Sequence, residues 1–160
     1  MIIEMVAAAA LTAPGAPTHG SRQSATVILS DHPELRALEE RFGWADAVVS
    51  GDMVYVSGVV AGKRPGETAM EPGFVRAFEQ LGAILNRAGA SFDDVIEVRS
   101  YHTDPVAQFK VFAEVKLRYI KAPSPAWTAV GTSGLLDPNG LVEISLVARI
   151  QPHSGKRGRP

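Results

Sequence analysis

The strongest candidate for a catalytic group is one carboxylate, Glu143, set in an apolar stretch near the end of the chain. Residues 141–150 read LVEISLVARI, an alternating pattern typical of a β-strand. Val142 and Ile144 would lie on one face and Glu143 on the other. A carboxylate there must be solvated, paired or used in chemistry, because burying a lone charge is costly. By frequency alone a structural or exposed glutamate is favoured, and an acid/base group is the alternative.

Composition argues against several other chemistries. The chain has no cysteine, so a disulfide, a thiolate metal site and a cysteine nucleophile are all excluded. The spacing of its four histidines, His19, His32, His102 and His153, does not fit a metal site. No cofactor is expected. A net charge of −1 argues against a nucleic-acid partner, and no apolar run reaches the roughly 18 residues of a membrane span.

The segment around Glu143 predicts a β-hairpin. Two apolar runs, Trp127–Leu136 and Leu141–Ile150, flank the tetrapeptide DPNG at 137–140. Proline at the second position and glycine at the fourth favour a type I turn. We therefore expect the two runs to pair as neighbouring strands.

Three helices are predicted upstream. The first runs from Pro33 to about Arg41, capped by Ser30 or Asp31 and ended by Gly43. Its apolar stripe is expected at Leu35, Leu38 and Phe42. The main helix spans 72–88, with an apolar stripe at Phe74, Phe78, Leu81 and Leu85. The last begins at Asp104-Pro105, with an expected buried stripe at Val106, Phe109, Ala113, Leu117 and Ile120.

The remaining segments read as strands. Trp44–Val49 and Met53–Val60 form a predicted hairpin around Ser50-Gly51-Asp52, and Val95–His102 follows the main helix. After the first helix the order is β-β-α-β-α-β-β, which predicts an α+β fold with two helices on one face of a single mixed sheet. The other face, with Glu143, would be uncovered and is a candidate interface.

These motifs resemble a known family. PSPAWTAVG and LVEISLVARI, preceded by VVSGDMVYVSG and ILNRAGASFDDVIEVRSY, are similar to the RidA/YjgF family, also called the L-PSP endoribonuclease family, over residues 42–152. The resemblance implies a chorismate-mutase-like fold and a homotrimer with small-molecule sites between subunits. It also implies a deaminase-type hydrolase that converts imines or enamines to 2-keto acids and ammonia.

The resemblance assigns roles to single positions. The glutamate that positions or activates water corresponds to Glu143, and the pocket serine to Ser57. The first-strand aromatic, usually tyrosine, corresponds to Trp44, and the backbone position beside the substrate carboxylate falls at Ala129. Tyr101 is a further candidate for the pocket wall. Without a nearby histidine-acid pair, Ser57 is not expected to be a nucleophile.

The family's arginine, which pairs with the substrate carboxylate, is replaced by Trp127. An indole offers one N–H and no charge, whereas arginine offers a charged fork. Ala113 stands where many members have asparagine. Two other cations do not obviously compensate, because Arg149 lies six residues from Glu143 on its strand and Arg99 lies on the opposite strand face from His102.

Two hypotheses follow. The first is a RidA-like imine or enamine hydrolase, or a tautomerase, with a more apolar pocket suited to a planar ligand. The second is a non-catalytic trimeric protein that binds a small apolar or aromatic metabolite. In either case Trp44 and Trp127 could instead simply fill the trimer interface. A ribonuclease lacks support, because the sequence has neither paired catalytic histidines nor a basic groove with interleaved aromatics.

The termini are treated separately from the domain. Residues 1–30 are expected to be an extension or linker, 31–152 the RidA-like domain and 153–160 a basic flexible tail. The amino terminus has a short apolar run followed by small residues, as a signal peptide would. It lacks a basic region and carries Glu4 instead, so a cytoplasmic location is expected.

Overall fold

The computed structural model describes residues 21–150. The expectations for the apolar amino terminus and the basic tail concern residues outside this range. A 3-10 turn, η1 (Ser21–Ser24), comes first. Strand β1 (Thr26–Ile28) then joins the sheet from within the segment expected to be an extension, pairing antiparallel with the next strand.

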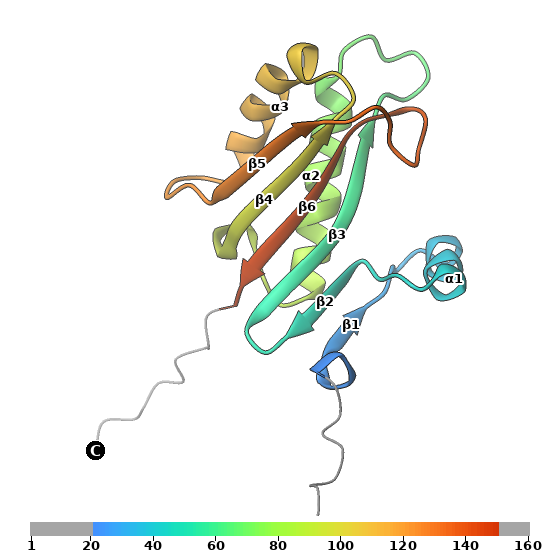
Figure 1. Ribbon diagram of the computed structural model, residues 1–160, viewed down its shortest axis with the longest axis vertical. Helices are drawn as coiled ribbons and strands as arrows, with labels where there is room; N and C mark the ends of the chain where they lie inside the picture. Colours follow the sequence, from blue (N-terminus) through green and yellow to red (C-terminus); the bar gives the residue numbers. More distant parts are fainter. Residues whose placement is uncertain (1–20, 151–160) are drawn as a thin grey trace, which may run out of the picture.

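The described chain forms one six-stranded mixed sheet with two long helices on one face. Its strand order is β1-β2-β3-β6-β4-β5, in which only the β4–β5 pair is parallel. Figure 1 shows α2 running behind the sheet, and α3 packs beside it. The predicted α+β layering is therefore confirmed. The elements after β1 are α1 (Pro33–Phe42), β2 (Ala47–Ser50), β3 (Met53–Gly62), α2 (Glu71–Arg87), η2 (Phe92–Asp94), β4 (Val95–His102), α3 (Pro105–Tyr119), β5 (Ala126–Gly131) and β6 (Gly140–Arg149).

The core lies between α2, α3 and the sheet. The predicted stripe of α2 is fully buried, as are the residues of β6 that alternate with Glu143. Each fully buried Phe or Leu side chain stabilises the fold by roughly 1.5–3 kcal/mol relative to exposure. The core residues with no exposed surface are Val54, Phe74, Phe78, Leu81, Leu85, Val98, Phe112, Val115, Val142, Ile144, Ala47 and Ala148.

The predicted hairpin of the last two strands is wrong, because β4 lies between β5 and β6. The turn itself forms: the Gly140 N–H donates to the Asp137 carbonyl at 2.9 Å, and the Asn139 N–H donates to the Asp137 side chain at 2.9 Å. Since β5 pairs with β4 in parallel, the chain crosses from one side of β4 to the other before β6 begins. A turn signal specifies a local reversal but not which strands become neighbours.

The apolar stripe predicted for α1 is also wrong in its burial. Leu35, Leu38 and Phe42 are 41%, 40% and 65% exposed, whereas Glu39 is buried. The helix stands beside the sheet rather than over it, so no second layer covers its stripe (Figure 1). Gly43 ends the helix in a left-handed conformation, as predicted, but the N-cap residue is His32 rather than Ser30 or Asp31.

Helix α3 buries a different stripe from the one predicted. Asp104 caps it as expected, accepting from the Ala107 N–H at 3.1 Å. Of the predicted stripe only Ile120 is buried, and three members are clearly exposed: Val106, Phe109 and Leu117. The buried face consists of Gln108, Phe112, Val115 and Lys116. Because two of these buried residues, Gln108 and Lys116, are polar, hydrophobic periodicity did not indicate this face.

Candidate functional site

Glu143 lies in the middle of the uncovered face of the sheet. It sits on β6 between Val60 of β3 and Tyr101 of β4, which are its direct partners in the two antiparallel ladders. Directly opposite residues share a face of the sheet, so Tyr101 and Glu143 project to the same side, with Cβ atoms about 5 Å apart. The Glu143 side chain is partly exposed there. The structure therefore brings these two predicted site residues together.

A β-bulge makes room for the carboxylate. Ser57 and Gly58 of β3 together oppose the single residue Ser145 of β6, between the pairs Val56–Leu146 and Val59–Ile144. A Cβ atom at Gly58 would overlap Oε1 of Glu143. The sequence analysis missed this role, although a glycine inside a strand is itself a signal of a bulge or a close approach.

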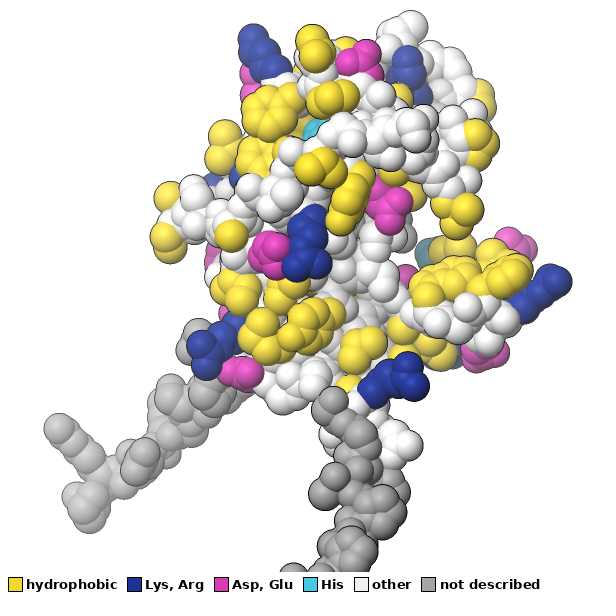
Figure 2. All heavy atoms as spheres, viewed as in Figure 1, with side chains coloured by type: hydrophobic (Ala, Val, Ile, Leu, Met, Phe, Trp, Pro, Cys, Tyr) yellow, Lys and Arg dark blue, Asp and Glu magenta, His cyan; other side chains and the backbone are white. Residues whose placement is uncertain are grey.

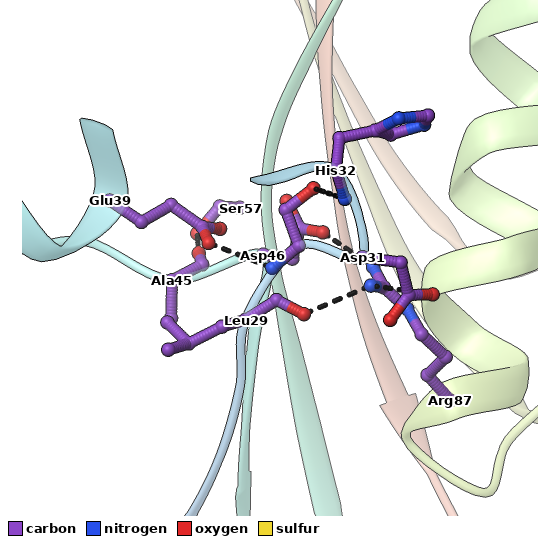
Figure 3. Close-up of polar contacts among 9 residues, drawn as sticks. Leu29, Asp31, His32, Glu39, Ala45, Asp46, Ser57 and Arg87 are labelled. Carbon is purple, nitrogen blue, oxygen red and sulfur yellow. Dashed lines mark hydrogen bonds and ion pairs between the residues drawn. The ribbon is translucent and has the colours of Figure 1, made fainter. Parts of the chain in front are cut away.

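Ser57 of β3 is hydrogen-bonded to the connection between α1 and β2, which contains Trp44. The Ser57 hydroxyl donates to the Ala45 carbonyl at 2.6 Å, and its N–H donates to the Asp46 carbonyl at 2.9 Å (Figure 3). Trp44 precedes β2, which starts at Ala47 rather than at the predicted position 44. Trp44 is 44% exposed and stacks on Phe42, with ring centroids 6.2 Å apart.

Arg87 of α2 anchors the same amino-terminal region. Its guanidinium donates to the Leu29 carbonyl at 2.9 Å and forms ion pairs with Asp31 at 3.2 Å and with Asp46 (Figure 3). The Glu39 carboxylate makes a further hydrogen bond in this region, accepting from the Ser30 N–H at 2.7 Å. These contacts hold α1 and the Trp44 connection against the body of the domain.

The two arginines considered as carboxylate partners are already paired. Arg99 makes a bidentate contact with Glu97, at 2.9 and 2.8 Å, and this contact raises the pKa of Arg99. Arg149 binds Asp52 at 2.7 Å and thereby lowers the pKa of that aspartate. Figure 2 shows such charged groups among hydrophobic side chains on the uncovered face.

Trp127 and Ala129 lie on the other side of the sheet from Glu143. They are on edge strand β5, in register with Val98 and Ser100 of β4, whose side chains are buried toward the helices. Four of the six predicted site residues therefore fall on two opposite faces of the sheet within one chain. Glu143 and Tyr101 share the uncovered face, whereas Trp127 and Ala129 face α3.

The indole of Trp127 is enclosed by α3. It stacks on Phe109, with centroids 5.2 Å apart and an interplanar angle of 6°, and Nζ of Lys116 lies 4.5 Å from its ring centroid. These two residues are two helical turns apart, roughly 10 Å, which leaves room for one ring between them. Burial lowers the pKa of Lys116. The indole N–H donates to Ser100 Oγ at 3.0 Å, so the only donor of Trp127 is used within the chain.

A pocket of about 440 Å³ opens beside this cluster, where α3 begins and β4 and β5 end. It is lined by His102, Pro105, Val106, Phe109, Lys110 and Ala129. Within residues 21–150 no group of acidic or histidine side chains has the arrangement of a metal site, and no helix is long and apolar enough to cross a membrane.

Comparisons with known proteins agree with this architecture. The family model described as Endoribonuclease L-PSP matches residues 34–150. The RutC family protein YjgH of Escherichia coli is 42% identical over 112 residues, which cover 67% of this chain and 82% of that protein. Reactive Intermediate Deaminase A, chloroplastic, of Arabidopsis thaliana is 28% identical over 112 residues, covering 67% of this chain and 58% of that protein.

Solved structures give the same answer for the fold. A YjgF-family protein from Mycobacterium tuberculosis superposes with a TM-score of 0.67 at 26% identity, covering 79% of this chain and 99% of that one. The solved structure of protein YjgH has a TM-score of 0.66 at 35% identity, covering 79% of this chain and 97% of that one. The chain therefore belongs to the RidA/YjgF family, the family of the Endoribonuclease L-PSP model.

Proposed function

We propose that the protein is a RidA-like hydrolase of small imines or enamines, with Glu143 as its acid/base group. The observation that carries this proposal is the placement of the Glu143 carboxylate beside Tyr101, in space left open by Gly58. The name of the Arabidopsis relative, a reactive intermediate deaminase, supports the same reaction class. We further propose that the protein works as a cytoplasmic homotrimer, in which a neighbouring subunit covers this face and completes the site.

The proposed chemistry needs one group that moves protons. Water adds to the carbon of the C=N bond while Glu143 accepts a proton from the water. Return of that proton to the nitrogen gives a carbinolamine. The proton of its hydroxyl group then passes through Glu143 to the nitrogen, so that the C–N bond breaks, ammonia leaves and a carbonyl product forms. An enamine first takes a proton on carbon, which the same carboxylic acid can deliver. A tautomerase would stop after that proton transfer.

The substrate is proposed to be more apolar than that of the usual deaminases. Trp127 occupies the position of the family's arginine, and its indole N–H, the only side-chain donor, is hydrogen-bonded to Ser100. Both arginines considered as substitutes are bound to acidic partners. Recognition would therefore rely on apolar contact and on Tyr101 more than on a charged fork at the family position.

The same observations favour the second candidate, a non-catalytic protein that binds a small apolar metabolite. A pocket can lose its charged anchor without losing its shape. Turnover separates the two candidates: binding without turnover is the signature of the second.

The test is an assay of keto-acid and ammonia release from imines generated in place by an amino-acid oxidase. Two substrate series are compared, one derived from small aliphatic amino acids and one from aromatic amino acids. The proposal predicts turnover, with kcat/KM higher for the aromatic series. Absence of turnover in both series, in a folded protein of confirmed oligomeric state, would leave the binding protein as the better account.

A further inference from the structure

Helix α1 carries its apolar side chains on the outside. Leu35, Leu38 and Phe42, here called the α1 stripe, are exposed, whereas the carboxylate of Glu39 is buried and accepts a hydrogen bond from the Ser30 N–H. A helix at a protein surface normally buries its apolar side and exposes its charges. The buried hydrogen bond fixes the rotation of α1 about its own axis, so the α1 stripe points away from the domain that carries it.

A second exposed apolar surface lies at the opposite edge of the sheet. It consists of Val106 and Phe109, here called the α3 patch, which are 93% and 46% exposed and line the pocket of about 440 Å³. β1 is the first strand of the sheet and β5 the last, so about 24 Å separates the two edges at about 4.8 Å between neighbouring strands. Figure 1 likewise shows α1 beside β1 and β2, on the far side of the sheet from α3. The two surfaces therefore do not meet within one chain.

The charges beside these two surfaces have opposite signs. Glu34 lines a pocket of about 640 Å³ along the α1 stripe, and Lys110 lines the pocket beside the α3 patch. Both side chains are exposed, and within residues 21–150 neither forms an ion pair. An apolar surface bordered by a free carboxylate is complementary to an apolar surface bordered by a free ammonium group.

We propose that the α1 stripe of one subunit docks on the α3 patch of the next subunit, with Glu34 paired to Lys110 of that neighbour. The contact rests on the homotrimer of the proposed function. In a ring with threefold symmetry every contact is head-to-tail, so one edge of each sheet meets the opposite edge of the next. Two α1 helices packed on each other would leave the α3 patch exposed, whereas the head-to-tail contact covers both surfaces.

The docked helix adds a wall to the pocket beside the α3 patch. In a single chain one wall of this pocket is Val106, whose side chain is almost entirely exposed. Leu38 of the neighbouring subunit would cover that side chain. The pocket is then built by two chains, and α1 serves as its apolar cover.

Disulfide trapping tests the contact directly, because the natural chain has no cysteine. A disulfide forms only where the two Cα atoms lie within about 7 Å. Leu38→Cys is combined with Val106→Cys or with Phe109→Cys in the full-length protein, and the oxidised products are separated on a non-reducing gel. At least one of the two double variants should give covalently linked dimers and trimers, and each single variant should give monomers alone.

Two results would overturn the proposal. Linked dimers from Leu38→Cys alone would show that α1 packs on α1, and absence of linked product from both double variants would show that α1 does not meet the α3 patch. Glu40→Cys combined with Val106→Cys is the matched control. Glu40 is exposed about 200° around the helix from Leu38, so this pair should not link.

A charge exchange tests the ion pair with exposed residues that should not disturb folding. Glu34→Lys and Lys110→Glu should each lower the urea concentration at which light scattering reports loss of the trimer. The double variant restores opposite charges and should recover at least half of that shift. If the two shifts simply add in the double variant, Glu34 and Lys110 are not paired and the proposed docking is wrong.

These measurements need no catalysis, so they separate the contact from the proposed function. A trimer that hydrolyses imines but gives no linked product in either double variant would keep the hydrolase and overturn the docking of α1. Linked trimers without imine turnover would support the docking and remove the hydrolase. A monomeric wild type would overturn the docking together with the trimer, while the imine assay would still decide the chemistry.

Discussion

At the scale of single residues, the site depends on what each side chain already contacts. The sequence predicted Glu143 on a face opposite the core, and its register between Val60 and Tyr101 confirms that placement. The sequence could not predict that the Trp127 side chain would face α3. That placement depends on the spacing of Phe109 and Lys116, which lie two helical turns apart and contact the indole from either side.

Gly58 tests the placement of the carboxylate. In Gly58→Ala the new methyl group would displace the Glu143 side chain, whose flexible end can move at little cost to the fold. We expect kcat to fall by about tenfold or more, since misplaced catalytic groups lose much of their rate, with a small change in Tm. Gly134→Ala, where a Cβ meets nothing within 4 Å, is the matched control. Full activity in Gly58→Ala would argue against a working carboxylate there.

Trp127→Arg tests whether the arginine can simply be restored. The arginine would replace an indole packed between Phe109 and Lys116, and would place two cations together. We expect the free energy of unfolding to fall by about 2 kcal/mol, less than for a fully buried aromatic ring, because Trp127 is only partly buried. Adding Lys116→Met should recover part of that loss and is required for any gain of imino-acid hydrolysis. A stable, active single variant would contradict this reading of the cluster.

His102 predicts a pH dependence of stability. Its pKa is lowered by burial in the folded state, so below about pH 6.5 the unfolded chain takes up a proton that the folded chain does not. Stability should fall as pH drops from 6.5 toward the folded-state pKa, by at most about 1.4 kcal/mol per pH unit. Urea unfolding at pH 7 and pH 5 checks this against His102→Phe, which should lose less stability. An equal loss of stability between pH 7 and pH 5 in the wild type and in His102→Phe would contradict the assignment of this pH dependence to His102.

At the scale of elements, hydrophobic periodicity predicted which helices and strands exist and where they begin and end. It was less successful at predicting which strands pair and which helix face is buried. β4 spans 95–102 as expected, and α2 begins and ends one residue before its predicted limits. The error on α3 came from Gln108 and Lys116, polar residues buried through hydrogen bonds to Thr103 and Asp104 and through contact with an indole. Such contacts are made by other elements and leave no mark on the periodicity of the helix.

The Arg87 anchor is predicted to hold β1 and α1 in place. Arg87→Met removes the bond to the Leu29 carbonyl and the ion pairs with Asp31 and Asp46. Because these groups are only partly buried, we expect a loss of about 1–2 kcal/mol, with faster amide exchange in residues 26–42 than in α2. Arg36→Met, on the exposed surface of α1, should leave exchange unchanged. Uniform protection in Arg87→Met would show that the segment is held by other contacts.

At the scale of the whole molecule, the sheet has a helix-covered face and an uncovered one. The uncovered face carries Tyr55, Tyr101 and Val130, which are 49%, 39% and 41% exposed, around the partly exposed Glu143. The order of elements predicted this layering, because two helices that pack together on one face leave the other face uncovered. What meets the uncovered face is a property of assembly and cannot be read from one chain.

The proposed homotrimer can be broken from this face. Tyr55→Glu introduces a charge where a neighbouring subunit would pack, so light scattering should report a shift from trimer toward monomer. Glu114→Lys, a charge change on exposed α3, should leave the trimer intact. A wild-type monomer, or a trimer unaffected by Tyr55→Glu, would place the interface elsewhere.

The most direct test of the central claim is kcat for imine hydrolysis in Glu143→Gln, beside Ser145→Ala on the same strand and face. Glutamine keeps the shape of the side chain and removes its capacity to accept a proton. If Glu143 is the acid/base group, kcat should fall by about 10²–10⁴-fold in Glu143→Gln and stay near the wild-type value in Ser145→Ala. Wild-type turnover that survives in Glu143→Gln would contradict the account.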